Sequence, residues 1–288
     1  MMADPEKYTF VDGSPRADLP LSDRGLAYGD GLFETMLVVN QLIPLWSLHK
    51  ARLFSGLRKL GIVLRQNQLD HHLQQIEKTL QQGSRDYWIH KLIVTRGSGG
   101  YGYRPEPESP ATIISQLFPK CESPLNRIEA SIHLCRQRLT ATPAWPGLKT
   151  LNQLLYVLAS RERHNTSFDE GLLLSVEGDL IEATARNLFI LKNGMLFTPK
   201  IGIYGVNGTM RRLIIENLAP VLDLKTVEKS LSVDDLRFAD EAFLCNAVTG
   251  IWPVISYSEN GRDCSRWYPG TITRKLQNDL NSWVHKTI

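Results

Sequence analysis

At residues 181–189 the chain reads Ile181-Glu182-Ala183-Thr184-Ala185-Arg186-Asn187-Leu188-Phe189. Apolar residues on both sides of a small-residue run predict two short strands. Glu182 stands inside the first of them. An isolated carboxylate is costly to bury, so this glutamate needs a charged partner unless its strand leaves it exposed. The segment therefore predicts either a buried carboxylate with a cationic partner or an exposed hairpin glutamate.

Lys149 precedes a predicted helix with one apolar face, formed by Leu151, Leu154, Leu155 and Leu158. The preceding residues 143–148 are apolar and carry no other charge. A free lysine has a pKa near ~10.4, so a lysine that reacts as an amine must be poised by burial or by a cationic neighbour. Most lysines are surface charges, and Lys149 alone does not decide between the two interpretations.

Lys149 and Glu182 together suit the cofactor pyridoxal 5'-phosphate (PLP). The lysine would hold the cofactor aldehyde as a Schiff base. The glutamate would keep the pyridine nitrogen protonated, so that the ring accepts electrons. The pyridinium N–H is also a charged partner of the kind that a buried Glu182 requires.

A phosphate site is predicted where Gly205-Val206-Asn207-Gly208 leads into a helix. Backbone N–H groups at a helix start bind anions, so the amides of Thr209 and Met210 would hold the cofactor phosphate. Arg52, one turn into another helix, would add a cationic contact, and Asn246 a hydrogen bond. The alternative is an ordinary helix entry. A P-loop is excluded, since no G-K-[ST] follows the glycines.

Gly97, Gly99 and Gly102 match G-x-G-x-x-G after a predicted strand. A dinucleotide site requires a helix next, and the following run Tyr103-Arg104-Pro105-Glu106-Pro107 does not favour one. We expect a flexible loop beside a pocket. Arg96 and Arg104 would bind substrate carboxylates there, because the guanidinium fork binds a carboxylate through two hydrogen bonds. A solvated glycine loop is the alternative.

The composition is that of a soluble globular protein, with 42% hydrophobic and 22% charged residues among 288. The net charge of +3 is spread along the chain and gives no reason to expect nucleic acid or a membrane as partner. The N-terminus lacks the apolar core of a signal peptide. The four cysteines are expected to be reduced, and the scattered histidines predict no metal site.

The order of predicted elements is not a regular β-α alternation, which indicates an α+β protein with mostly antiparallel sheets. The chain is expected to form a smaller N-terminal α/β domain (1–118), a linker (119–127) and a larger cofactor-binding domain (128–288). The predicted strands are 32–39 with 42–45 as a hairpin, 87–95, 112–117, 128–136, 171–176, 180–184, 188–191, 195–198 and 242–245. The predicted helices begin near Ser47, Leu69, Lys149, Gly208 and Ile272.

Taken together, these segments resemble the fold-type IV PLP enzymes, which include branched-chain aminotransferases, D-amino acid transaminases and aminodeoxychorismate lyases. The resemblance runs from Asp23-Arg24-Gly25-Leu26-Ala27-Tyr28-Gly29-Asp30-Gly31 to Trp252-Pro253-Val254. It implies a D-amino acid aminotransferase-like fold of two domains. It also implies Lys149 as the Schiff-base lysine, Glu182 as the partner of the pyridine nitrogen and Arg52 as the main phosphate contact.

Segments at 96–103, 148–152 and 205–208 are most similar to the lyases of this family, as is Asn246-Ala247. An arginine of some lyases is replaced by Tyr101. The resemblance implies conversion of 4-amino-4-deoxychorismate to 4-aminobenzoate and pyruvate, a step of folate synthesis, with Tyr28, Arg96 and Arg104 near the substrate. The alternative is a transaminase acting on D-amino or branched-chain amino acids. A cytoplasmic homodimer is expected, with the active site near the subunit interface.

Overall fold

The structure, a computed structural model, describes residues 8–16, 18–83, 85–125, 129–164, 166–268 and 270–287. The chain divides into two compact units, which we describe separately. The first contains the described residues up to Ser123 together with Leu148–Asn152, and the second contains those of Pro124–Gly147 and Gln153–Thr287.

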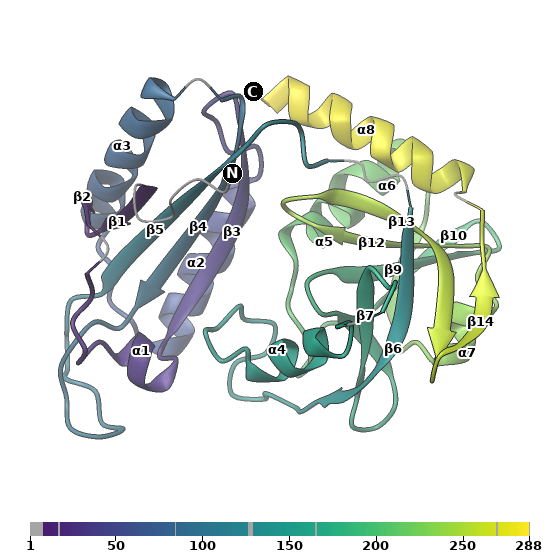
Figure 1. The fold of residues 1–288 in the computed structure, drawn as a ribbon, viewed down its shortest axis with the longest axis horizontal. Coiled ribbons are helices and arrows are strands. Elements are labelled where there is room, and N and C mark those ends of the chain that lie inside the picture. Colours follow the sequence, from purple (N-terminus) through teal and green to yellow (C-terminus); the bar gives the residue numbers. More distant parts are fainter. Residues whose placement is uncertain are drawn as a thin grey trace. The chain divides into compact units, whose positions relative to one another are not determined.

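The first unit is an antiparallel sheet with helices on one face (Figure 1). Its strand order is β2-β1-β5-β4-β3. The strands are β1 (Thr9–Val11), β2 (Ser14–Pro15), β3 (Gly31–Val39), β4 (Tyr87–Thr95) and β5 (Thr112–Lys120), and the helices are α1 (Arg24–Tyr28), α2 (Trp46–Leu60) and α3 (Gln66–Gln82). Alternation along β4 buries every second side chain, and Leu53, Leu57 and Leu69 of the helices pack against that face.

The second unit contains a larger mixed sheet. Its order is β11-β10-β9-β12-β13-β6-β7-β8, with β14 paired to β13. The strands are β6 (Ala130–Leu139), β7 (Glu170–Ser175), β8 (Leu180–Ala183), β9 (Asn187–Lys192), β10 (Met195–Pro199), β11 (Thr226–Lys229), β12 (Glu241–Asn246), β13 (Gly250–Glu259) and β14 (Arg262–Arg266). The pairs β10–β11, β13–β6 and β6–β7 are parallel and the others antiparallel.

The helical elements of the second unit are α4 (Leu154–Arg161), α5 (Thr209–Leu213), the π-helical turn η2 (Ile214–Leu218), α6 (Ala219–Val221), α7 (Val233–Arg237) and α8 (Thr271–Thr287). The elements α5, η2 and α6 follow one another without a gap and form one continuous helical run with a π turn inside it. Helix α8, yellow in Figure 1, buries Leu276, Leu280 and Val284. The α+β class predicted from the sequence is confirmed.

Several predicted elements are confirmed, among them β4, α3 and the hairpin of β9 and β10. The turn of that hairpin has positive φ at both Asn193 (51°) and Gly194 (72°), which is why Asn-Gly is favoured there. The predicted hairpin of 32–39 with 42–45 is wrong. β3 pairs with β4 over its whole length, and Leu42 makes only an isolated bridge to Val39.

Two predicted helix starts are also wrong. Helix α2 begins at Trp46, so Ser47 lies inside it rather than at its cap. Helix α4 begins only at Leu154, so Leu151 lies outside it. Leu154 itself is 70% exposed, so these leucines do not form the expected buried face. Strand β6 begins at Ala130; the expected start at Ile128 lies outside the described residues.

Candidate active site

Lys149 lies in a short extended segment docked on β3. Its carbonyl oxygen accepts from the backbone N–H of Phe33 (3.0 Å), and the N–H of Leu151 donates to Gly31 (3.0 Å). Its Nζ lies 4.2 Å from the centre of the Phe33 ring. Pro143, Ala144 and most of the loop before Lys149 are exposed, and desolvation of its amine stays a prediction. The face of the Phe33 ring attracts the ammonium group.

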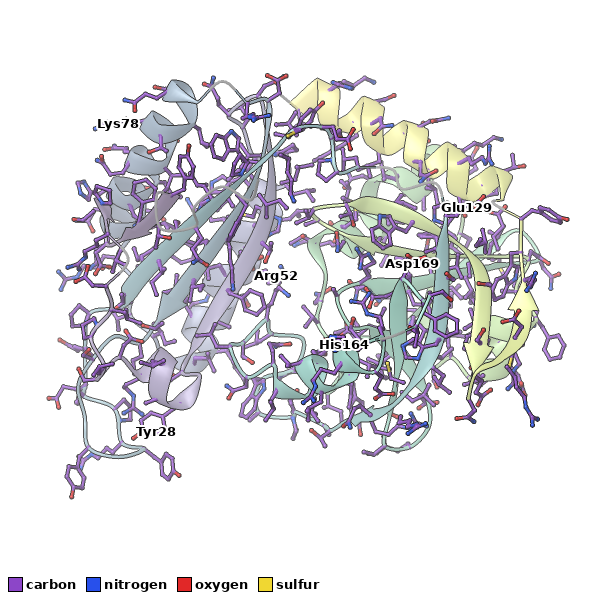
Figure 2. The ribbon with its side chains drawn as sticks, in the orientation of Figure 1. Tyr28, Arg52, Lys78, Glu129, His164 and Asp169 are labelled. Atoms are coloured by element: carbon purple, nitrogen blue, oxygen red, sulfur yellow. The ribbon has the colours of Figure 1, made fainter. Side chains whose placement is uncertain are left out.

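Arg52 of α2, labelled in Figure 2, forms a bidentate ion pair with Glu34 of β3. Its Nε donates to Oε1 at 2.9 Å, and Nη2 donates to Oε2. His49 Nδ1 lies 2.6 Å from the same Oε2. Burial by itself raises the pKa of Glu34, but Arg52 and His49 outweigh it and lower that pKa to about 2. Glu34 therefore stays ionised and fixes the guanidinium that was predicted to contact the phosphate.

The pKa of His49 moves downward. Burial is the largest cause, and the positive charges of Arg52 and Lys149 add to it. The charges of Arg52 and Lys149 therefore both act on His49, which lies beside Glu34. A neutral imidazole donates its Nδ1–H to the carboxylate and adds no further charge beside Lys149.

Glu182 of β8 is buried, with 3% of its surface exposed. Oε1 accepts from the Tyr156 hydroxyl at 2.5 Å, and Oε2 accepts from Asn187 Nδ2 at 3.0 Å. The N–H of Val206 lies 3.2 and 3.1 Å from the two oxygens. These contacts orient both carboxylate oxygens. The exposed-hairpin alternative for Glu182 is wrong.

The loop of 205–208 is built tightly around that carboxylate. A Cβ on Gly205, whose φ is +72°, would lie 2.8 Å from Ile181 Cγ2 and 3.2 Å from Glu182 Cδ. A Cβ on Gly208 would lie 1.9 Å from Asn187 Oδ1. Asn187 Nδ2 also donates to the carbonyl of Val206 at 3.0 Å. The glycines are therefore required by close approach and not only by loop geometry.

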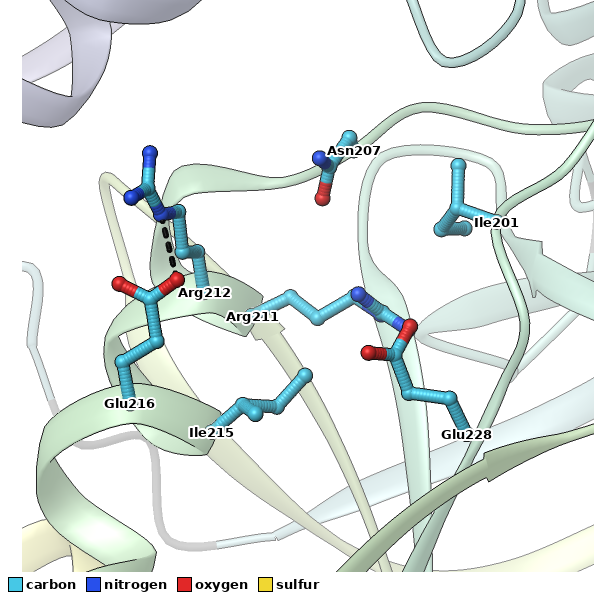
Figure 3. Close-up of a pocket in the computed structure, with 7 residues that line it drawn as sticks. All are labelled: Ile201, Asn207, Arg211, Arg212, Ile215, Glu216 and Glu228. Carbon is cyan, nitrogen blue, oxygen red and sulfur yellow. Dashed lines mark hydrogen bonds and ion pairs between the residues drawn. The ribbon is translucent and has the colours of Figure 1, made fainter.

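Helix α5 starts at Thr209, where the N-cap Gly208 brings no side chain. Thr209 and Met210 are both buried. Arg211, which is 3% exposed, anchors this turn: Nη2 donates to Pro199 O (3.0 Å) and to Glu228 Oε2 (2.5 Å). Figure 3 shows this pair at a cavity of about 320 Å³, with Arg212 and Glu216 at its other side. The helix start is thus fixed by β10 and β11 rather than by a cap.

Asn246 ends β12, and its side chain organises the next turn. Oδ1 accepts from the N–H groups of Val248 (3.0 Å) and Thr249 (2.8 Å), and Nδ2 donates to Ala185 O at 3.2 Å. Its side chain therefore ties the turn after β12 to the segment that follows Glu182. A direct bond from Asn246 to a phosphate stays a prediction.

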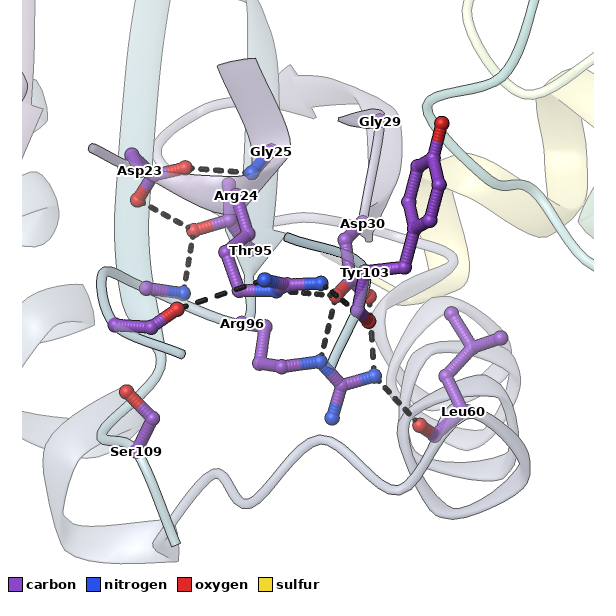
Figure 4. Close-up of polar contacts among 12 residues, drawn as sticks. Asp23, Arg24, Gly25, Gly29, Asp30, Leu60, Thr95, Arg96, Tyr103 and Ser109 are labelled. Carbon is purple, nitrogen blue, oxygen red and sulfur yellow. Dashed lines mark hydrogen bonds and ion pairs between the residues drawn. The ribbon is translucent and has the colours of Figure 1, made fainter. Parts of the chain in front are cut away.

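The glycine loop after β4 is held by backbone and side-chain hydrogen bonds, and its flexibility stays a prediction. Tyr101 and Arg104 form a tight turn through two backbone hydrogen bonds. The buried Arg24 holds it, since Nη1 donates to Gly102 O (2.9 Å) and Nη2 to Tyr103 O (3.0 Å). Figure 4 shows Arg24 beside Asp30. No local sequence pattern predicts these contacts, because Arg24 lies far from the loop along the chain.

Arg96 also binds Asp30 (Figure 4). Nε and Nη2 donate to Asp30 at 2.6 and 3.0 Å, and Nη1 and Nη2 donate to the carbonyls of Gly61 and Leu60. Burial raises the pKa of Asp30, but Arg96 and Arg24 more than compensate and lower it. This arrangement leaves Arg96 little capacity to receive a substrate carboxylate. Arg104 is exposed, and Tyr28 is 41% exposed with its ring 5.5 Å from that of Tyr103.

A second cavity of about 530 Å³ lies in the second unit, lined in part by Tyr156, Glu170, Arg186 and Trp252. Arg186 pairs with Glu170, and its guanidinium carbon lies 3.4 Å from the centre of the Trp252 ring. Tyr156 belongs to both this lining and the Glu182 site. Sequence reasoning missed Tyr156, because nothing in a helical tyrosine indicates a carboxylate on a later strand. Asn187, in contrast, stands in the motif quoted first.

Of the predicted residues, Lys149, Arg52, Tyr28, Arg96 and Arg104 belong to the first unit, and Glu182, Thr209, Met210 and Asn246 to the second. The second set converges, since Asn187 and Val206 link Glu182 to the loop before Thr209. Within the described residues no cluster of metal-ligating side chains occurs. Among the helices described, none has the length and apolarity of a membrane span.

Comparison with known proteins identifies the family. The model of "Amino-transferase class IV" matches residues 31–257. An aminodeoxychorismate lyase of Vibrio harveyi is 34% identical over 95% of this chain and 99% of its own. A putative branched-chain-amino-acid aminotransferase of Methanocaldococcus jannaschii is 32% identical over 93% and 91%. The crystal structure of 4-amino-4-deoxychorismate lyase from Pseudomonas aeruginosa matches with a TM-score of 0.84 and 37% identity, covering 95% and 98%. The chain belongs to the class IV aminotransferase family.

Proposed function

We propose that this chain is a PLP-dependent lyase that converts 4-amino-4-deoxychorismate to 4-aminobenzoate and pyruvate, in folate synthesis. The observation that carries the proposal is the buried Glu182 carboxylate, oriented by Tyr156, Asn187 and the Val206 amide inside a glycine loop. An ionised carboxylate oriented in this way can accept a hydrogen bond from a protonated pyridine nitrogen. Likeness over nearly the full length of two named lyases favours this reaction within the family.

The residues fit the cofactor. Glu182 would bind the pyridine nitrogen, and Lys149 would hold the cofactor covalently through Nζ. Arg52, the amides of Thr209 and Met210, and Asn246 would contact the phosphate. When bound, PLP supplies a ring that accepts the electrons released as a proton leaves the substrate.

The proton transfers are assigned to Lys149. With its Nζ unprotonated, Lys149 would take the proton from the substrate carbon that bears the nitrogen. It would later return a proton to the enolpyruvyl group, whose bond to the ring carbon breaks as the ring becomes aromatic, so that pyruvate leaves. Acid–base steps of this kind contribute typically ~10² to 10⁴ in rate.

Substrate contacts are assigned to Tyr28 and Arg104, which border the turn clamped by Arg24. Arg96 is assigned a supporting role, because it binds Asp30, the carboxylate that also pairs with Arg24. A cytoplasmic homodimer is also proposed. Tyr101 and Tyr103 are 92% and 88% exposed in the first unit, and a second copy would cover them. The cysteines are free thiols, as the cytoplasm favours. Sedimentation velocity would give the oligomeric state.

A transaminase is the second candidate, favoured by the 32% identity to the Methanocaldococcus jannaschii relative. The decisive experiment supplies purified, PLP-loaded protein with 4-amino-4-deoxychorismate, with D-alanine plus 2-oxoglutarate, and with leucine plus 2-oxoglutarate. We expect 4-aminobenzoate and pyruvate in equal amounts from the first. Consumption of either amino acid without turnover of the first compound would reject the lyase and support the transaminase.

A further inference from the structure

Tyr156 makes a hydrogen bond that the proposed reaction has not yet used. It projects from α4, and its hydroxyl lies 2.5 Å from Glu182 Oε1 on β8. Both residues belong to the second unit. Asn187 and the Val206 amide orient the same carboxylate, but both are fixed by the glycine loop. Tyr156 approaches from a different element, and its contact is the shortest of those described for Glu182.

The direction of this hydrogen bond is settled by the ionisation state of the phenol. Burial raises the pKa of Tyr156 well above its ordinary value, and the Glu182 charge raises it further. The phenol therefore keeps its proton and donates it to the carboxylate. An O–H donor to an anionic oxygen is short and about twice as strong as a neutral hydrogen bond. It withdraws charge from the carboxylate and makes Glu182 a weaker base.

We infer that Tyr156 is a positioning residue that sets, through Glu182, how far the cofactor's ring nitrogen is protonated. The inference rests on the proposed PLP site and concerns the chain's own Tyr156–Glu182 pair. With Tyr156 present, the proton shared by the ring nitrogen and Glu182 stays on the nitrogen, where it makes the ring a good electron acceptor. Without this donor, Glu182 becomes more basic and draws the proton toward itself.

The test replaces Tyr156 by Phe, which removes one oxygen and keeps the ring. Tyr204→Phe is the matched control, because the Tyr204 hydroxyl also donates to a glutamate, Glu177, at 2.6 Å, but in an exposed position. Both variants are loaded with PLP carrying ¹⁵N in the ring. The ¹⁵N chemical shift measures protonation of that nitrogen without any substrate. The second readout is kcat and KM for the substrate.

For Tyr156→Phe we expect the ¹⁵N signal to move toward the unprotonated position. We expect kcat to fall about tenfold to a hundredfold, as for loss of a hydrogen bond to a charged group, with KM changed less than about twofold. Tyr204→Phe should match the wild type in both readouts. An unchanged ¹⁵N shift in folded Tyr156→Phe would overturn the inference, even if activity fell.

A second substitution keeps the test decisive if Tyr156→Phe does not fold. Replacing Tyr156 by 3,5-difluorotyrosine keeps the hydroxyl and makes it a stronger donor. The ¹⁵N signal should then move toward the protonated position, opposite to Tyr156→Phe, and a shift in the same direction as Phe would reject the inference. A protein that binds PLP but acts as a transaminase would reject the lyase proposal, while the ¹⁵N comparison would still decide the role of Tyr156.

Discussion

At the scale of single residues, Lys149 and Lys91 lie over the same aromatic ring. Their Nζ atoms are 4.2 and 5.9 Å from the centre of Phe33. We predict that Lys149→Ala lowers 4-aminobenzoate formation by about 10⁴ or more, because covalent attachment and proton transfer are both lost. Lys91→Ala, which removes an equivalent amine from the same ring, should keep normal turnover. Borohydride followed by mass spectrometry should mark Lys149 in the wild type, and full activity of Lys149→Ala would remove the mechanism.

The Glu34–Arg52 pair gives a second prediction. Glu34→Gln removes a buried counter-charge of Arg52, whose own side chain is 13% exposed, so the free energy of unfolding should fall by about 3–5 kcal/mol. The exposed pair of Arg212 and Glu216 provides the control, since Glu216→Gln should cost only about 0.5 kcal/mol or less. Urea titration of both variants makes the comparison. Equal losses would show that Glu34 is not an effectively buried counter-ion.

A site residue can be predicted from sequence only where its local pattern indicates its role. Glu182 was predicted because burying a carboxylate in an apolar strand costs free energy unless it has a partner. Tyr156 and Arg24 were not, because each reaches an element distant along the chain. Arg96 is the opposite case. Its residue type suits a substrate carboxylate, but only the structure shows Asp30 and two helix-end carbonyls occupying its donors.

At the scale of elements, the entry to α5 depends on Gly208. Its φ of −66° suits any residue, so among the described residues the obstacle to Gly208→Ala is the close contact with Asn187 Oδ1. Pushing Asn187 aside disturbs both Glu182 and Val206, and we predict about tenfold weaker PLP binding by the apoprotein. Gly178→Ala is the opposite case, with a positive φ of 98° and nothing nearby. It should lower stability by about 1 kcal/mol and leave PLP affinity unchanged; fluorescence titration measures the affinity.

The elements that the sequence predicted well have strong periodicity of their own. Helix α3 and strand β4 each show one unbroken pattern between clear stops. The failures come from partners chosen at long range. Residues 42–45 follow a plausible turn, yet β3 finds its partner in β4. Strand β13 was missed because Pro253 lies within it, although it pairs there with Phe243.

At the scale of the molecule, buried histidines predict acid sensitivity. Burial is the main cause that lowers the pKa of His72 to about 4 and that of His90 to about 3, from 6.5. Both are neutral when folded and bond to Ser115, so the unfolded chain binds more protons below pH 6.5. Stability is therefore complete above pH 6.5 and falls as the pH drops toward 4, by at most about 1.4 kcal/mol per pH unit for each histidine.

Urea unfolding at pH 7.5, 6.5 and 5.5 measures this slope. His90→Gln should make it shallower by up to one proton, whereas the exposed His285→Gln should not change it. Identical slopes in all three proteins would mean that His90 is not protected from protonation in the folded state.

Thiol reactivity gives another prediction for the whole chain. Cys121 and Cys264 are exposed, whereas Cys135 and Cys245 are buried and their pKa values rise to about 12. Because the thiolate is the reactive form, Ellman's reagent should label only the exposed pair in native protein. The other two should react after unfolding in urea. Rapid labelling of Cys245 in native protein would contradict the burial described for β12.

The fold class could be predicted from the order of elements, but the strand order of the sheet in the second unit could not. Its parallel pairs join strands far apart in sequence, such as β6 and β13, and no local pattern reports such pairing. The same holds for the return of Leu148–Asn152 to the first unit. Domain bounds drawn at 118 and 128 follow composition alone and remain a prediction.

The docking of Lys149 on β3 has a practical consequence. Main-chain atoms of Lys149 and Leu151 make the hydrogen bonds to Phe33 and Gly31. These hydrogen bonds therefore do not depend on the side chain at position 149. Truncating that side chain leaves a vacancy in front of an otherwise intact backbone. Small soluble amines such as methylamine would then have room to substitute for the missing group, which makes the position suited to chemical rescue and to installing an unnatural nucleophile.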